Sequence, residues 1–193
     1  MNPYQQQIAV GSRSSTTANK LIRKLITLGG YYGLLFHTYK LRDSAWGLLS
    51  IFGLTGFMGL TLGPIVAQYL HLPNGTHIVM TAMGGTGAIF LGLSAYALTS
   101  RKDFSFLGGF LMAGILVAFL AGLAAIFFHM PALSLGVAAM FTLLMCGMIL
   151  FETSQLVHGG ETNYILATIS LYVSIYNLFL SLLQLIGAFS GDD

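Results

Sequence analysis

Long apolar runs dominate the chain, and short polar segments separate them. Charged residues are absent from 44–100, 104–151 and 162–191. A helix crosses the hydrocarbon core of a bilayer with roughly 20 apolar residues, so each of these blocks has room for one or two crossings. The pattern predicts a polytopic helical membrane protein.

Breaks at charges, at proline and at an Asn-Gly pair divide the chain into six apolar spans, which are 25–39, 45–70, 77–99, 104–128, 131–151 and 164–189. The last five are full length. The first would make about 22 Å of helix, less than the roughly 30 Å core, and crosses only if its flanking cations reach outward. We expect an all-α transmembrane bundle, with a polar, basic N-terminal segment at 1–24 and a short acidic tail at 190–193.

The distribution of Lys and Arg predicts the orientation, because cytoplasmic loops are enriched in both. Segments 40–43 and 101–103 are basic, whereas 71–76 and 129–130 contain neither residue. The basic loops therefore face the cytoplasm, and alternation places 152–163 there too.

The basic N-terminal segment also favours the cytoplasm, and one crossing cannot place both it and 40–43 inside. Either the first span does not cross, or the N-terminal tail is forced out, or the chain lacks a crossing that its charge pattern was built around. We favour the third explanation.

Composition narrows the function classes. Only 7% of residues are charged, 55% are hydrophobic and the mean hydropathy is +0.80, whereas soluble domains have about 25% charged residues. This excludes a cytosolic enzyme, a nucleic-acid binder and a disordered regulator. The single cysteine, Cys146, cannot form an intramolecular disulfide, and we expect it to be a packing residue.

Glu152 is the only carboxylate that borders the apolar stretch of its span. A glutamate at the C-terminal end of a helix opposes the helix dipole, so it needs a polar partner or a path to water. Acids at this depth often mark ion or proton pathways. The alternative is an interfacial glutamate that points into headgroups and water.

The last span carries a polar stripe at helical steps of 4, 3, 4 and 3, formed by Ser170, Ser174, Asn177, Ser181 and Gln184. Residues at this spacing share one helix face, and helices in lipid turn such faces toward neighbours. The stripe either hydrogen-bonds another helix or forms one wall of an ion or proton path.

No catalytic motif accompanies these residues in the sequence. It lacks the nucleophile elbow of hydrolases and the zinc-binding motif of metalloproteases. The five histidines are scattered near span ends without metal-ligand spacing. We therefore expect no catalytic residue, no metal and no cofactor.

Four stretches resemble the Bax inhibitor-1 family, in particular its bacterial YccA-like branch: GGYYGLLFHTYKLR at 29–42, LTGFMGLTLGPIVAQYL at 54–70, TSRKDFSFLGGFLMAGI at 99–115 and ILFETSQLVHGGETNYI at 149–165. The resemblance implies seven helices, a cytoplasmic N-terminus and a central last helix. Here the segments that would flank the family's first crossing abut, so we expect that helix to be missing, in agreement with the charge conflict.

The resemblance implies two functions. YccA-like members resemble modulators of the membrane-bound ATP-dependent protease FtsH, and other members act as pH-sensitive calcium leaks through two acids on the last two helices. The positions of those acids correspond to Glu152 and Ser174 here, so the second acid is missing. Two close carboxylates can share a proton. Glu152 and Ser174 cannot form such a pair, so a pH latch of that kind is not available. His158 and Glu161 match the YccA-like pattern in the loop before the last span.

We therefore expect a non-enzymatic protein of the bacterial inner membrane that contacts lipid and possesses no nucleic-acid partner. Its expected role is to modulate a membrane protease. The alternative is a calcium or proton leak with Glu152, Ser174 and Asn177 in its polar core.

Overall fold

The computed structural model describes residues 29–30, 33–34, 36–40, 44, 46–100 and 102–190. Within these residues five long helices follow one another: α2 (Trp46–Leu70), α3 (Gly75–Ser100), α4 (Leu107–Phe127), α5 (Pro131–His158) and α6 (Tyr164–Phe189). Each is long and apolar enough to cross a membrane. The prediction of an all-α transmembrane fold is confirmed.

Four of the predicted spans agree with helices to within three residues at either end, and the limits of α6 are those of its predicted span. The span predicted at 131–151 ends too early, because α5 continues for almost two further turns to His158. Of the first predicted span, 25–39, residues 29–30, 33–34 and 36–39 are described and are helical, and the others lie outside the described residues, as do the N-terminal segment and the acidic residues of the tail.

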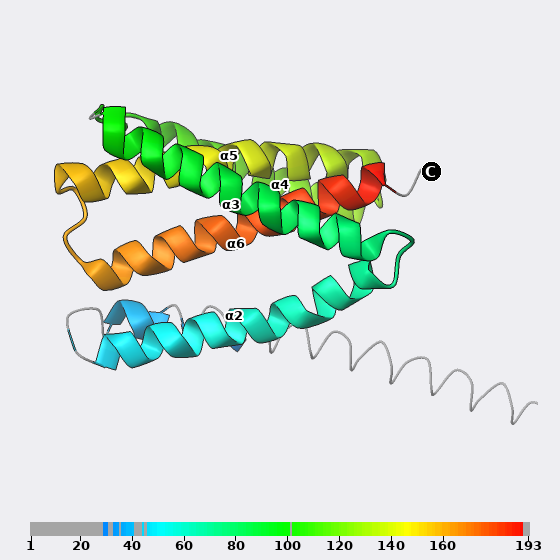
Figure 1. Cartoon of the computed structure of the whole chain (residues 1–193), viewed down its shortest axis with the longest axis horizontal. Helices are drawn as coiled ribbons and strands as arrows, with labels where there is room; N and C mark the ends of the chain where they lie inside the picture. The colour runs from blue at the N-terminus through cyan, green and yellow to red at the C-terminus, as the bar shows by residue number, and fades with distance from the viewer. Residues whose placement is uncertain are drawn as a thin grey trace, which may run out of the picture. The chain divides into compact units, whose positions relative to one another are not determined.

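The chain divides within α2 into two compact units, residues 1–61 and 62–193. In the second unit α5 packs against α4, α3 and α6, and α3 also packs against α6. Figure 1 shows α5 and α6 running antiparallel, with the α3–α4 and α5–α6 loops at the same end. The candidate site lies at this end.

Helix α6 contributes to two hydrophobic clusters of this unit. Leu178 packs with α4 and α5 residues such as Leu111, Leu144 and Ile149. Phe179 and Leu183 pack with Ile78 and Ala82 of α3, and the end of α2 from Leu62 onward covers them. The neighbouring residues Leu178 and Phe179 of α6 thus face different partners, and it is α5 that packs against α3, α4 and α6 alike.

The outer face of α4 carries large apolar side chains that protein does not cover, including Phe110, Met112, Leu116 and Phe127. An apolar surface of this extent is unstable in water and suits a hydrocarbon environment. The same helix buries its small residue Ala118 completely. Helix α4 therefore turns its large apolar side chains toward lipid and its small residues toward α5.

Candidate functional site

The site begins with four consecutive polar residues in the apolar helix α5: Glu152, Thr153, Ser154 and Gln155. The helix continues past them because its stop signal comes later. Gly159 has a φ of 74°, the left-handed conformation that commonly ends a helix. The amides of Gly159 and Gly160 both donate to the Gln155 carbonyl. The polar run is therefore held in helical geometry.

The side chain of Glu152 is buried, with 7% of its surface exposed. The hydroxyl of Ser174 on α6 donates to Glu152 Oε2 at 2.9 Å. Glu152 lies six residues before the end of α5 and Ser174 ten residues after the start of α6, which places them about 9 Å and about 15 Å from those helix ends. The carboxylate therefore lies well inside the helical layer.

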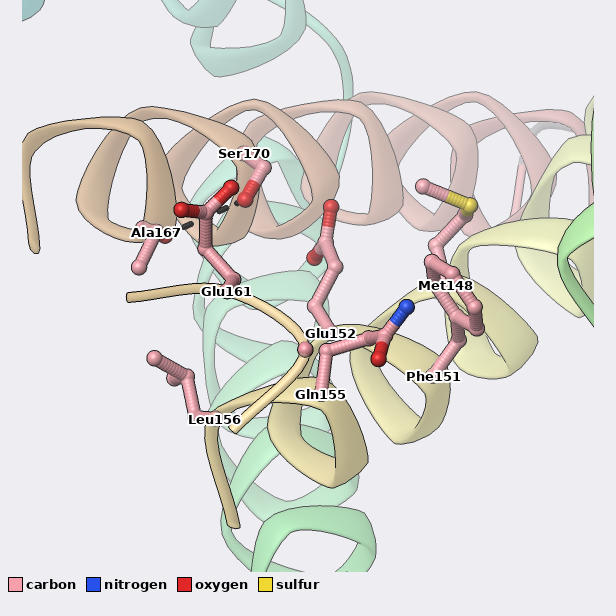
Figure 2. Close-up of a pocket in the computed structure, with 9 residues that line it drawn as sticks. Met148, Phe151, Glu152, Gln155, Leu156, Glu161, Ala167 and Ser170 are labelled. Carbon is pink, nitrogen blue, oxygen red and sulfur yellow. Dashed lines mark hydrogen bonds between the residues drawn. The ribbon is translucent and has the colours of Figure 1, made fainter. Parts of the chain in front are cut away.

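A cavity of about 240 Å³ connects Glu152 with the loop between α5 and α6. Its polar lining consists of Glu152, Gln155, Glu161 and Ser170, and its apolar lining includes Met148, Phe151 and Ala167. Figure 2 shows Glu152 between Gln155 and Glu161, with Ser170 on the α6 side. The cavity brings a buried acid, a loop acid, an amide and a hydroxyl around one space.

The other residues of the polar run contact different elements, as the 100° step between neighbouring helix residues requires. Thr153 Oγ1 lies 3.4 Å from Ser94 Oγ of α3. Ser154 Oγ accepts a hydrogen bond from the Phe104 amide at 3.0 Å, and Gln155 Oε1 accepts one from Ser105 at 3.4 Å. About one turn of α5 thus joins α3, the α3–α4 loop and α6.

Of the predicted α6 stripe, Ser174 donates to Glu152, and Ser170 lines the cavity within reach of the same carboxylate. Asn177 Nδ2 donates to Val173 O of its own helix. Gln184 donates to Ser134 Oγ at the start of α5, at 2.7 Å. The stripe therefore splits among separate partners along α6.

The two residues predicted in the loop before the last span have different positions. His158 belongs to the last turn of α5, so its assignment to a loop was wrong; its Nδ1 lies 3.0 Å from Ser154 O. Glu161 is in the loop, where its Oε1 accepts from the Asn163 amide at 2.8 Å. Asn163 in turn caps α6, accepting from the Ile165 and Leu166 amides.

The α3–α4 loop contains a second acid, Asp103, whose Oδ1 accepts hydrogen bonds from the hydroxyl and the amide of Ser105. These two bonds hold the pKa of the exposed Asp103 carboxyl below its usual value. Within the described ranges no three His, Cys, Asp or Glu residues gather as a metal site.

Thr153, Ser154, Gln155 and Ser105 were not among the residues predicted for the site. The sequence held one signal for the α5 residues. The Gly159-Gly160 pair is a typical helix end, and placing the predicted end of the helix there would have included Thr153, Ser154 and Gln155. Ser105 carried no such signal, since its contact with Gln155 joins residues 50 positions apart.

Comparison with known proteins identifies relatives over most of the chain. The family model described as "Inhibitor of apoptosis-promoting Bax1" matches residues 7–191. An uncharacterised protein of Pseudomonas aeruginosa is 58% identical over 168 residues, which cover 87% of this chain and 76% of that relative. An uncharacterised membrane protein of Vibrio cholerae is 46% identical over 162 residues, 83% of this chain and 73% of the relative.

The relative from Escherichia coli K12 named "Modulator of FtsH protease YccA" is 54% identical over 168 residues, again 87% of this chain and 76% of the relative. Its counterpart in another strain is named "Inner membrane protein YccA". These names and the five apolar helices agree with the predicted location in the inner membrane. Because a family model matches nearly the whole chain and these relatives are about half identical to it over their aligned residues, the chain belongs to the Bax inhibitor-1 family and is YccA-like.

Proposed function

We propose that this chain is a non-enzymatic inner-membrane protein that binds and modulates an FtsH-type membrane-bound ATP-dependent protease. The observation that carries the proposal is the 54% identity to the Escherichia coli modulator of FtsH over 168 residues. That similarity covers most of the chain, so it is not limited to a common apolar pattern.

The chemistry of the polar residues supports a role without catalysis. Thr153 and Ser154 contact a hydroxyl and a backbone amide of neighbouring elements, and Ser174 donates to a carboxylate. These contacts position helices and a loop. Ser154 Oγ also lies 3.4 Å from His158 Nδ1, but this nitrogen lies closer, 3.0 Å, to the Ser154 carbonyl. Because a carbonyl can only accept a hydrogen bond, Nδ1 carries the proton there and does not act as a general base toward the hydroxyl.

The direct test is co-purification followed by reconstitution. The tagged chain is extracted from native membranes in mild detergent, and the protease is sought in the eluate. Purified protease is then placed in proteoliposomes with and without the chain, and turnover of a membrane substrate is measured. We expect recovery of the protease and a changed turnover rate. Recovery no better than from an unrelated tagged six-span protein, together with unchanged turnover, contradicts the proposal.

A cation leak is the second candidate, and one arrangement favours it: a buried carboxylate that faces a cavity extending to the α5–α6 loop. Proteoliposomes loaded with a calcium-sensitive dye test it. Calcium entry that falls at least several-fold in Glu152→Gln, but not in the helix-bonded control Thr142→Ala, supports the leak. Absent flux, or equal flux in parent and Glu152→Gln, rejects it.

A further inference from the structure

Gln155 links the α3–α4 loop to the cavity. It lines the cavity that contains Glu152, and its Oε1 lies within hydrogen-bond distance of the Ser105 hydroxyl. Its side chain also fills the space next to Gly160, where an added Cβ would collide with the Gln155 amide. Gln155 is therefore held between the two loops at the loop end of the cavity.

Ser154 attaches the same loop to α5. The residue is completely buried, and its Oγ accepts from the Phe104 amide at 3.0 Å and lies 3.4 Å from the Lys102 carbonyl. A buried backbone amide without a partner is strongly disfavoured. Because the Phe104 amide is partly buried, Ser154 stabilises the loop on α5 by supplying its acceptor.

We propose that residues 102–106, here called the strap, restrict access to the Glu152 cavity, and that Ser154 is the residue that holds the strap closed. When the strap is attached, Ser105 stays beside Gln155 and Gln155 stays at the cavity. When the strap detaches, Gln155 loses its partner on the loop and can turn away from the cavity, which opens a route for water to Glu152. This role concerns the cavity alone and does not depend on the protease partnership.

The experiment measures access to the cavity directly. Cys146 is replaced by Ser, and Ser170→Cys places a thiol in the cavity lining, where the Ser170 hydroxyl lies beside the Glu152 carboxylate and donates to Ala167 O of its own helix. The reaction rate with a charged thiol reagent is measured in nanodiscs. We expect Ser154→Ala to raise the rate at least fivefold.

Two further variants keep the test decisive. Thr142→Ala removes a hydroxyl from the same helix that bonds only its own backbone, at Ala138, and should leave the rate unchanged. Ser105→Ala alters only an exposed strap residue, so folding is retained, and it should raise the rate to a smaller degree.

Hydrogen exchange of a peptide covering 102–106 reports strap detachment independently. Faster exchange in Ser154→Ala together with faster labelling supports the proposal. Labelling that stays at the parent rate in both Ser154→Ala and Ser105→Ala overturns it, whether or not exchange rises. Equal acceleration by Thr142→Ala overturns it as well.

Discussion

The Ser174 hydroxyl of the neighbouring helix α6 donates to Glu152 Oε2 at 2.9 Å. A buried polar group that loses its partner retains its desolvation cost, so the bond matters most when it is removed. In membranes the measured value of such interhelical bonds is smaller than this reasoning suggests, about 0.6 kcal/mol on average.

We therefore expect Ser174→Ala to lower the free energy of unfolding by about 0.5–2 kcal/mol. Thermal or denaturant unfolding in detergent, followed by circular dichroism, measures this change. Thr168→Ala is the matched control, because Thr168 is exposed and bonds only Tyr164 O in its own helix. Equal losses in the two variants would mean that the bond to Glu152 contributes nothing specific.

Asp103 gives a prediction for pH dependence. The Ser105 hydroxyl and amide lower the pKa of its carboxyl in the folded state. The carboxylate form therefore adds stability above the unfolded-state pKa, and this contribution is lost as the pH falls through the lowered folded-state pKa. Asp103→Asn should lack this dependence. The difference in Tm between parent and variant should shrink between about pH 7 and about pH 3, and a constant difference would contradict the assignment.

At the scale of the elements, helix ends determine the shape of the site. The αL glycine at 159 places the polar run of α5 inside the helix, and Asn163 starts α6 only four residues later. A short connection of this kind keeps Glu161 beside the cavity.

Loss of the α6 cap should cost about 1 kcal/mol of unfolding free energy, the usual value for an N-cap. The variant is Asn163→Ala, since Asn163 Oδ1 accepts from Ile165 N at 3.0 Å and Leu166 N at 3.2 Å. Asn163→Asp retains an acceptor and should stay within a few tenths of a kcal/mol of the parent. Chemical unfolding in detergent distinguishes the two, and equal destabilisation would show that the cap is not the cause.

The contact between α4 and α5 relies on reciprocal glycines. A Cβ at Gly114 would lie 2.5 Å from Leu144 Cδ2, and one at Gly147 would lie 2.7 Å from Leu111 Cδ2. Each glycine therefore accommodates a leucine from the other helix, which is how small residues allow close helix packing in membranes.

Gly147→Ala should destabilise the protein by about 1 kcal/mol, at the lower end of overpacking costs, because the end of a leucine side chain can move. Gly136→Ala on the same helix meets nothing within 4 Å and should be neutral or slightly stabilising, since alanine favours helix. Tm values in one detergent provide the comparison. A larger loss at Gly136 would contradict the packing argument.

At the scale of the whole molecule, the alternation of α3 to α6 places their loops at opposite ends. The α3–α4 and α5–α6 loops share one end (Figure 1), and they are joined through Ser154 and Gln155. Lys102, one of the basic residues that predict a cytoplasmic position, lies in the α3–α4 loop at this end. This charge predicts that the strap and the mouth of the Glu152 cavity face the cytoplasm.

Reporter fusions test this orientation. Fusions after Asp103 and Gly160 should report the cytoplasm, and fusions after Asn74 and His129 should report the periplasm. Any two fusions from the same end that report different sides would contradict the arrangement. This test does not involve the protease, so a wrong orientation and a missing protease partnership would be detected separately.

The sequence alone determined the class of this protein. Long uncharged blocks such as 104–151 favour helices in lipid, because backbone groups in hydrocarbon must bond within their own segment. The limits of α6 were predictable because Asn163 and the apolar run after it mark the start of a helix. The family resemblance implied that Glu152 and Ser174 lie opposite each other, and the polar stripe of the last span offered Ser174 as one of several possible partners.

Only the tertiary structure decided how the polar residues are distributed among partners. Glu152 was expected at a helix end, yet α5 continues to His158 and draws Thr153, Ser154 and Gln155 into the helix. Their partners lie about 50 or more positions away in the chain. Local pattern describes which face a residue occupies, but the neighbour on that face depends on how the helices pack, and that packing arises from the apolar and small residues of all of them together.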